Sequence, residues 1–214
     1  MILGIDTSLG TAVAVVEPGG LVRSEASSDD PRGHAEAIGE LIARALADAS
    51  AVPSDVAHVA AGMGPGPFTG LRVGIAAARA FALGRGIPVV PVVSHDAVAL
   101  ADALRGADTA RFAVVTDARR REFAYTVYDG LDGDGLPTRA AGPALAPRDD
   151  LDGVLAGLGA QRRDAGAVPA SMIALAAARA LAAGREIGPH DALYLRSPDV
   201  TAPTGVTGTR RVVA

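Results

Sequence analysis

Residues 2–17 read ILGIDTSLGTAVAVVE, an apolar run that ends at Asp6, a polar turn, and a second apolar run. This pattern is typical of two β-strands joined by a tight turn. Residues 112–128, FAVVTDARRREFAYTVY, repeat the arrangement, with Asp117 at the expected end of the first strand. The same strand–turn–strand unit therefore occurs in each half of the chain.

An Ala-rich segment also occurs twice. Residues 76–87 (AAARAFALGRGI) and 176–187 (AAARALAAGREI) share their first five letters, a Gly-Arg pair and a final Ile. We interpret the two repeats as an internal duplication. Strand pairs followed by helices predict an α/β fold of two lobes, each built around a mixed sheet. The second lobe is expected to be abbreviated, because residues 129–150 read as a Gly/Pro/Asp-rich hairpin and loop.

The apolar spacing predicts three helices in the first half. One covers residues 34–49, one begins at an N-cap Thr69 and ends with Gly84 as its C′ residue, and one has Ser94 as its cap and ends near Leu104. We expect residues 1–106 to form the first lobe, 107–203 the second lobe, and 204–214 a flexible tail.

Composition excludes several kinds of chemistry. The 214 residues include no Cys and no Lys, so all 20 basic residues are Arg. The chain therefore has no thiol nucleophile, disulfide, Schiff base or phosphate-binding lysine. The net charge of -4 argues against binding nucleic acid by bulk charge alone. No targeting or membrane-spanning segment is evident, so we expect a cytoplasmic protein without membrane contact.

The loop GMGPGPFTG at residues 62–70 is the most distinctive stretch. A Gly-rich loop before a helix suggests phosphate binding. Pro65 and Pro67 weaken that interpretation, since each removes an N–H donor. A rigid turn that positions the next helix is the alternative.

The helix after this loop carries Gly70, Gly74, Ala78 and Ala82 at intervals of four. Such a row of small residues allows close approach of another element. Two hypotheses remain open at this point: packing within the lobe, or contact with a partner.

Polar residues at the two expected strand ends form the other candidate site. Asp6, Thr7, Ser8, Asp117 and Arg119 occupy the positions where duplicated ATP-using folds hold a metal-bound nucleotide. An Asx turn that caps the hairpin is the preferred interpretation at Asp6, and more so at Asp117, where no hydroxyl or Gly follows to receive phosphate. The basic run 119–121 is interpreted as a solvated turn or as a contact with an anionic partner. No His pair has the spacing of a zinc helix, and no metal site is expected.

Five motifs together resemble the TsaB (YeaZ) family, and the resemblance extends from Met1 to about Pro203. The motifs are Ile5-Asp6-Thr7-Ser8, Pro31-Arg32-Gly33-His34, the segment 62–74 (GMGPGPFTGLRVG), Thr116-Asp117-Ala118-Arg119 and Tyr194-Leu195-Arg196.

The resemblance implies a duplicated actin-like/Hsp70/sugar-kinase (ASKHA) fold and a non-catalytic role. A protein of this family dimerises with a TsaD-type transferase, which threonylcarbamoylates N6 of the adenosine 3′-adjacent to the anticodon in tRNAs that read codons beginning with A. A TsaE-type ATPase assists, tRNA is bound by the complex, and ATP and Mg are used by the partners, with no cofactor on this chain alone.

The resemblance also implies that the two helices of the first lobe form the interface. The expected contact residues are His34, Ile38, Leu41, Ile42, Ala45, Phe68, Thr69, Gly70, Arg72, Val73, Gly74, Ala77 and Ala78. Asp6, Thr7, Ser8, Asp117 and Arg119 are then a degenerate nucleotide site. Three alternatives remain: a sugar-kinase-class enzyme that binds ATP, a homodimer when alone, and a glycoprotease-like peptidase.

Overall fold

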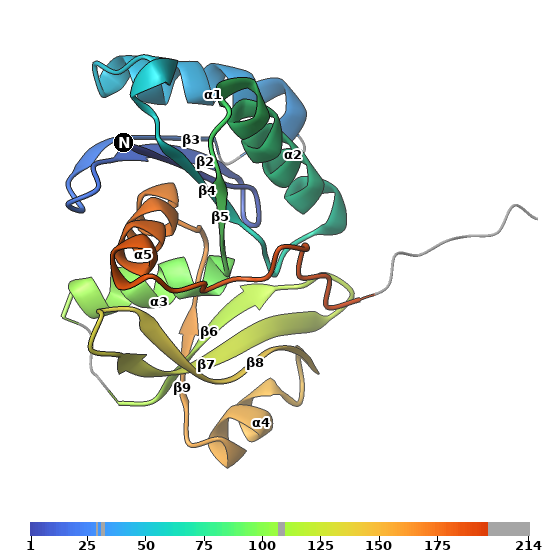
Figure 1. The fold of residues 1–214 in the computed structure, drawn as a ribbon. Helices are drawn as coiled ribbons and strands as arrows, with labels where there is room; N and C mark the ends of the chain where they lie inside the picture. The colour runs from blue at the N-terminus through green and yellow to red at the C-terminus, as the bar shows by residue number, and fades with distance from the viewer. Residues whose placement is uncertain (29, 31–32, 107–109, 197–214) are drawn as a thin grey trace, which may run out of the picture.

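The computed structural model describes residues 1–28, 30, 33–106 and 110–196 (Figure 1). The elements in chain order are β1 (Ile2–Asp6), β2 (Thr11–Val16), β3 (Val22–Ser28), α1 (His34–Asp48), a short 3-10 turn (Pro53–Asp55), β4 (His58–Gly62), α2 (Phe68–Arg85), β5 (Val89–Val92), α3 (Ser94–Leu104), β6 (Phe112–Asp117), β7 (Glu122–Leu131), β8 (Pro137–Pro147), α4 (Leu151–Gly157), β9 (Gln161–Asp164) and α5 (Ala170–Ala183). Pro31 and Arg32 of the motif Pro31-Arg32-Gly33-His34, and the tail 204–214, lie outside the described residues.

The two sheets share one topology. The first has the order β3-β2-β1-β4-β5 and the second has β8-β7-β6-β9. In each, the first strand of the hairpin pairs antiparallel with the second and parallel with a later strand, β4 in the first sheet and β9 in the second. This arrangement confirms the duplicated two-lobe α/β fold. The second sheet has one strand fewer, which confirms that this lobe is abbreviated.

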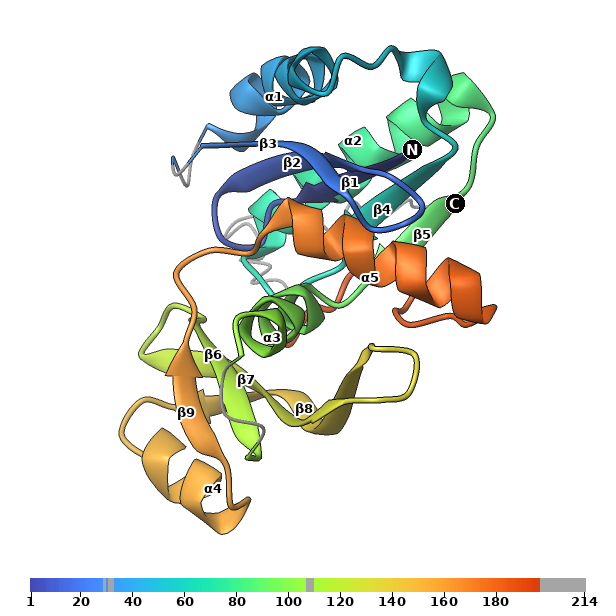
Figure 2. The ribbon, with the colours of Figure 1, turned by 90° about the vertical axis from the view of Figure 1, so that its left-hand side faces the viewer.

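Helices and sheets alternate in layers. α1 and α2 cover the outer face of the first sheet, and α5 crosses its inner face (Figures 1 and 2). α3 lies between α5 and the second sheet, while α4 covers the far side of that sheet. The later of the two Ala-rich helices, α5, thus packs against the sheet of the first lobe and joins the two halves.

Side-chain alternation along β1 explains these layers. Leu3 and Ile5 point into the core beneath α1 and α2, whereas Ile2 belongs to the core shared with α3 and α5. All of β1 is buried, as expected for a central strand covered on both faces. A small third core of aliphatic side chains lies between the second sheet and α4.

The boundaries of α2 differ from the sequence prediction. The N-cap is Pro67, not Thr69, and the helix continues through Arg85 to Gly86, whose φ is 65°. Gly86 takes the left-handed conformation that ends the helix and donates its N–H to the carbonyls of Ala82 and Leu83. The prediction chose Gly84 because the Gly-Arg pair repeats, but the glycine that can end the helix lies two residues later.

The segment 129–150 was predicted as a hairpin and loop, and only the hairpin is correct. β7 turns at residues 132–136 into β8, which is an 11-residue strand. α4 and β9 follow and were missed altogether. Both are short, so their local propensity is weak. Pairing with β6 decides β9, and burial of Leu151 and Leu155 against the second sheet holds α4.

Gly4 sets how closely α5 approaches the first sheet. A Cβ added there would lie 2.3 Å from the carbonyl oxygen of Ala170 and 3.0 Å from the Cβ of Ala174. We therefore expect Gly4→Ala to lower the free energy of unfolding by about 1–3 kcal/mol or more, because two backbones would have to separate. Urea denaturation followed by circular dichroism would measure the change.

Gly39→Ala is the matched control for this substitution. Gly39 lies in α1, and an added Cβ there would meet no atom within 4 Å. Removing a helical glycine should stabilise the chain by about 0.5–1 kcal/mol. Equal effects of the two substitutions would contradict the proposed packing of α5.

Candidate functional site

A buried carboxylate lies where β1 ends. The Asp6 side chain accepts hydrogen bonds from the Ser94 hydroxyl at 2.6 Å, the Ser8 amide at 2.7 Å and the Ser8 hydroxyl at 3.2 Å. The Ser8 amide bond closes an Asx turn. Ser94 Oγ in turn accepts the Gly64 N–H at 3.0 Å. One carboxylate thus links the first hairpin, α3 and the loop that precedes α2.

Burial disfavours the charged form of this carboxylate. It raises the pKa of Asp6 from 3.8 to about 6, although the hydrogen bonds from Ser94 and Ser8 act in the opposite direction. Ser94 was expected to begin α3 as a cap. The N-cap is Val93, and the Ser94 hydroxyl is directed at Asp6 instead.

Thr7 attaches the same hairpin to α2. Its hydroxyl donates to the Gly70 carbonyl at 2.7 Å and accepts the Gly74 N–H at 3.2 Å. A Cβ at Gly74 would lie 2.2 Å from Thr7 Oγ1, and one at Gly70 would lie 2.8 Å from the Thr7 carbonyl oxygen. The row of small residues on α2 therefore packs within the lobe, which decides between the two hypotheses of the sequence analysis.

The Gly/Pro-rich loop covers Asp6. A Cβ at Gly62 would lie 1.8 Å from Asp6 Oδ2, and one at Gly66 would lie 2.8 Å from the Ser8 Cα. The loop backbone fills the space next to the carboxylate, and only 2% of Asp6 is exposed. These residues do not fit a metal-bound nucleotide, because Asp6 is enclosed and already accepts three hydrogen bonds.

The equivalent aspartate of the second lobe is exposed. Asp117 pairs with Arg148 at 2.8 Å and accepts the Arg119 N–H at 2.9 Å. Partial burial alone would raise the pKa of Asp117, but the Arg119 amide and the Arg148 guanidinium outweigh it and hold that pKa below its usual range. Asp117 and Asp6 are therefore not equivalent in environment, despite their equivalent places in the fold.

A turn of unusual backbone conformation follows Asp117. Arg119, Arg120 and Arg121 have φ values of 60°, 51° and 61°. A non-glycine residue in this left-handed region costs about 1–2 kcal/mol, and three in succession are rare. The turn directs Arg119 and Arg120 toward the other lobe.

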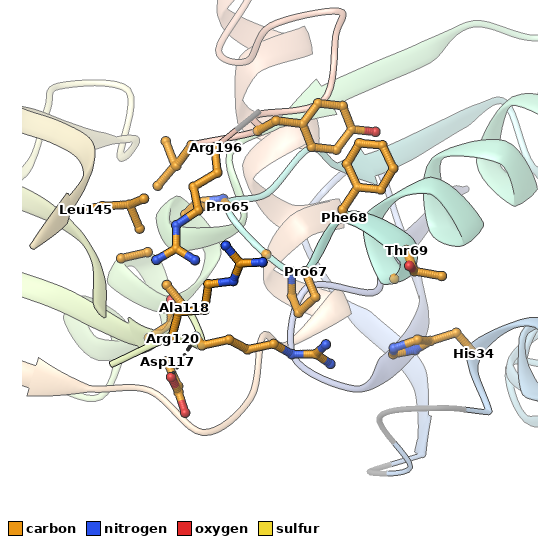
Figure 3. A pocket seen from close by; sticks show the side chains of 17 residues that line it. His34, Pro65, Pro67, Phe68, Thr69, Asp117, Ala118, Arg120, Leu145 and Arg196 are labelled. Atoms are coloured by element: carbon orange, nitrogen blue, oxygen red, sulfur yellow. Dashed lines mark hydrogen bonds between the residues drawn. The ribbon is translucent and has the colours of Figure 1, made fainter. Parts of the chain in front are cut away.

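A pocket of about 610 Å³ lies between the lobes. One wall is the start of α2 and the loop before it, and the other is the β6–β7 turn (Figure 3). Arg120 and Arg196 extend into the space between Leu145 and Ala118 on one side and His34, Pro67 and Phe68 on the other (Figure 3). The pocket brings together Asp117, Arg119, His34, Phe68, Thr69 and Gly70 of the sequence-predicted residues, together with Tyr194–Arg196. Asp6, Thr7 and Ser8 do not line it.

The predicted interface residues fall into two groups. Seven are buried inside the first lobe: His34, Ile38, Leu41, Ala45, Gly70, Gly74 and Ala78. Six are partly or fully exposed: Ile42, Phe68, Thr69, Arg72, Val73 and Ala77. The first group packs on the lobe's own sheet and hairpin, so a partner cannot touch it directly. The interface prediction then depends on the second group.

Sequence reasoning missed a different row of small residues. Ala35, Gly39, Ala43 and Ala47 are exposed and lie at intervals of four on α1. They form the face opposite the apolar stripe of α1, where small residues allow another helix to approach closely. The spacing is visible in the sequence, but a row of small residues is a weaker signal than the apolar stripe on the other face of this helix.

The interlobe core holds two buried polar groups without access to the pocket. His95 hydrogen-bonds with Thr126 and Thr116 at 2.8 and 3.0 Å, and burial lowers its pKa to about 3. Asp96 accepts a hydrogen bond from Tyr128 and pairs with Arg139. In the described ranges, no group of three or more His, Asp or Glu side chains could hold a metal ion. Nor does any helix in those ranges have the length and apolar character needed to cross a membrane.

Parts of this sequence are similar to known proteins. Residues 10–161 match the family model described as TsaD: tRNA N6-adenosine threonylcarbamoyltransferase. An uncharacterized protein of Mycobacterium tuberculosis is 40% identical over 154 residues, covering 71% of this chain and 67% of that protein. A tRNA N6-adenosine threonylcarbamoyltransferase of Streptococcus pneumoniae is 46% identical over 74 residues, covering 35% of this chain but 21% of that enzyme.

The fold has a solved counterpart. A Pseudomonas aeruginosa protein described as similar to peptidase YEAZ superposes with a TM-score of 0.72 at 26% identity. The match covers 91% of this chain and 99% of that one. The two-lobe architecture is therefore shared along nearly the whole length of both chains.

The raised pKa of Asp6 predicts a pH-dependent stability. Between about pH 4 and pH 6 the folded chain binds this proton more readily than the unfolded chain, so the free energy of unfolding falls as pH rises. The shift from 3.8 to about 6 corresponds to about 3 kcal/mol. We expect the stability of wild type relative to Asp6→Asn to fall by about that amount from pH 4 to pH 7, measured by urea denaturation at each pH.

Asp48→Asn is the control, since the Asp48 side chain is 54% exposed on α1. The same measurements on this variant give the baseline for removing an exposed aspartate. A constant difference between wild type and Asp6→Asn across this range would show that Asp6 is not desolvated as described.

Proposed function

The chain belongs to the YeaZ/TsaD family of tRNA N6-adenosine threonylcarbamoyltransferases, and from this premise we propose that it is a non-catalytic subunit that dimerises with a separate TsaD-type transferase. In that role it supports N6-threonylcarbamoylation of the adenosine 3′-adjacent to the anticodon, in tRNAs that read codons beginning with A. The family membership supports a part in tRNA modification. The non-catalytic, dimerising role is what we propose beyond it.

The match to the Pseudomonas YEAZ-like protein supports a role beside the transferase. It covers 91% of this chain and 99% of that protein. The sequence match to the Streptococcus transferase covers 35% of this chain and 21% of that enzyme.

The surroundings of Asp6 favour this role over an ATP-using kinase. The carboxylate that a kinase of this fold would direct at a metal-bound nucleotide is enclosed by the segment from Gly62 to Gly66. We propose that ATP and Mg are used by partner proteins, among them a TsaE-type ATPase, and that the complex works in the cytoplasm. The peptidase alternative has little support in the pocket. The Thr116 hydroxyl lines it and hydrogen-bonds with His95, but that histidine does not line the pocket, and burial lowers its pKa to about 3, which makes it a weak base.

We propose the outer faces of α1 and α2 as the docking surface. The exposed row Ala35, Gly39, Ala43 and Ala47 lies on α1, and Arg72, Val73, Ala76, Ala77 and Ala80 present a partly apolar face on α2. Both helices lie on the side of the first sheet away from the second lobe (Figure 1). Two helices with short side chains can pack closely against two helices of a partner. The same surface could pair with a second copy when the partner is absent.

Gly39→Trp tests this surface without disturbing the lobe. Gly39 is exposed and a Cβ added there meets no neighbouring atom within 4 Å, so the variant should fold. The indole would stand between the paired helices, and we expect the affinity for the transferase to fall by at least tenfold, about 1.4 kcal/mol. Co-elution in size-exclusion chromatography and isothermal titration calorimetry would measure it.

Gly153→Trp is the matched control. Gly153 is also exposed, helical and free of neighbours within 4 Å, but it lies in α4 of the second lobe. It should bind the transferase like wild type. Unchanged binding by Gly39→Trp, or an equal loss with Gly153→Trp, would move the interface away from α1.

A further inference from the structure

The start of α2 leaves three backbone donors unused at the interlobe pocket. No hydrogen bond joins the N–H of Phe68, Thr69 or Gly70 to another described residue. The first bond of the helix runs from the Leu71 N–H to the Pro67 carbonyl. Pro67 provides no side-chain cap, and the first turn of α2 holds no acidic residue. Residues 68–70 all line the pocket, so their N–H groups and the positive end of the helix dipole favour an acceptor there.

A buried imidazole faces the same place. His34 is the first residue of α1, only 8% of it is exposed, and it lines the pocket beside Thr69 (Figure 3). Its Nδ1 hydrogen-bonds with the Thr11 hydroxyl at 2.7 Å, while its Nε2 forms no hydrogen bond with the residues that the structure describes. Nε2 lies next to the start of α2, because a Cβ added at Gly70 would be 3.1 Å from it. A polar atom on a side chain this buried normally has a partner, and a ligand in the pocket would supply one.

The Thr11 hydroxyl decides what Nε2 offers to such a ligand. Thr11 is buried, and among the described residues its hydroxyl hydrogen-bonds with His34 Nδ1 alone. A buried hydroxyl proton needs an acceptor, so we assign the hydroxyl as the donor and Nδ1 as the acceptor. The neutral imidazole then carries its proton on Nε2, which adds a fourth donor to the three of α2.

We propose that His34 and the start of α2 bind an oxyanion, the phosphate or carboxylate group of a small molecule. Backbone N–H groups at a helix start are a common site for such groups. The pocket, at about 610 Å³, is larger than the oxyanion alone and is within the range of small-ligand sites. The rest of the molecule would lie near the rings of Phe68 and Tyr194, which also line the pocket and whose centroids are 4.7 Å apart.

The attraction comes from these donors rather than from net charge. The charged side chains of the pocket are largely balanced, since Arg196 pairs with Glu122 and Asp117 pairs with Arg148. Arg120 has a partner as well. A site that depends on directed N–H groups should therefore discriminate by position, and single substitutions beside the donors should change its affinity.

The loop before α2 does not supply the donors. In the sequence, Pro65 and Pro67 weaken phosphate binding by this loop, because each removes an N–H group. Neither proline affects the site proposed here, since its donors belong to the first turn of α2 and to α1.

A paired substitution removes the imidazole donor without leaving a buried polar partner behind. His34→Phe combined with Thr11→Val replaces both members of one hydrogen bond by apolar groups, a change that can be nearly neutral for stability. We expect the affinity for the oxyanion to fall at least about tenfold, as for the loss of one hydrogen bond to a charged group.

Thr69→Asp provides a second variant that should not unfold the chain. Thr69 is exposed in the first turn of α2, where a carboxylate is favourable, so the melting temperature should equal or exceed that of wild type. The new carboxylate would occupy or repel the oxyanion site, and we again expect a loss of at least about tenfold. Gly153→Asp is the matched control, because it makes the same charge change in the first turn of α4, outside the pocket. It should bind like wild type.

Nuclear magnetic resonance of the isotopically labelled full chain would measure binding, with inorganic phosphate and acetate titrated separately at constant ionic strength. We expect the amide signals of residues 68–70 and the His34 Nε2 signal to shift together along one saturable curve. Saturation by phosphate alone identifies a phosphate ligand, and saturation by acetate alone identifies a carboxylate. Saturation by both shows that the site recognises any oxyanion.

Three results would overturn the proposal. The first is no saturable shift with either probe. The second is unchanged binding by Thr69→Asp or by a folded paired variant. The third is an equal loss with Gly153→Asp.

The oxyanion site and the proposed dimerisation can fail separately. The paired variant should still co-elute with the transferase, because His34 and Thr11 are buried. Gly39→Trp should still bind phosphate or acetate like wild type. Loss of transferase binding by Gly39→Trp, together with no saturable shift in wild type, would leave the function intact and remove the site.

Discussion

The hydrogen bond between Ser94 and the buried Asp6 carboxylate is the interaction on which the rest of the site depends. A buried carboxylate is costly unless its oxygens are satisfied, so the three donors from Ser94 and Ser8 must be held in place. Holding them fixes the first hairpin to the start of α3. Because Ser94 also accepts the Gly64 N–H, the loop before α2 is held against the same group. The position of α2, and with it one wall of the interlobe pocket, follows from this network.

The same network closes the space next to Asp6. That space is filled by the backbone between Gly62 and Gly66. Glycine is required at both positions, because a Cβ would collide with Asp6 or Ser8. The open cavity lies toward the second lobe and is lined by Asp117, Arg119, Arg120 and Arg196.

Small residues determine how the layers of the molecule come together. Gly4 allows α5 to lie directly on the first sheet, and Gly70 and Gly74 allow α2 to lie directly on Thr7. With only 3% aromatic residues, the chain fills its cores with aliphatic side chains and relies on close backbone approach rather than on large rings. A separate set of small residues, on the outer face of α1, remains exposed. The two sets of small residues are alike in sequence but differ in role. Gly4, Gly70 and Gly74 are buried by packing within the chain, whereas the small residues of α1 remain available for contact.

The sequence by itself determined the duplicated two-lobe architecture. In each half, an apolar strand ends in an aspartate, Asp6 or Asp117, and a turn leads to a second strand. These strands and the repeated Ala-rich helices are recognisable from local periodicity and turn residues. It also determined the motifs that place the chain in its family. Only the tertiary structure decided that Gly74 and Ala78 face inward, that Asp6 is enclosed while Asp117 is exposed, and that Arg119, Arg196 and Phe68 share one pocket. It also decided α4 and β9, whose local propensities are weak: β9 is held by pairing with the distant strand β6, and α4 by burial of Leu151 and Leu155 against the second sheet. One physical reason applies to all of these features. Burial and charge environment depend on contacts between residues that lie far apart in the chain, and a local sequence pattern does not show those contacts.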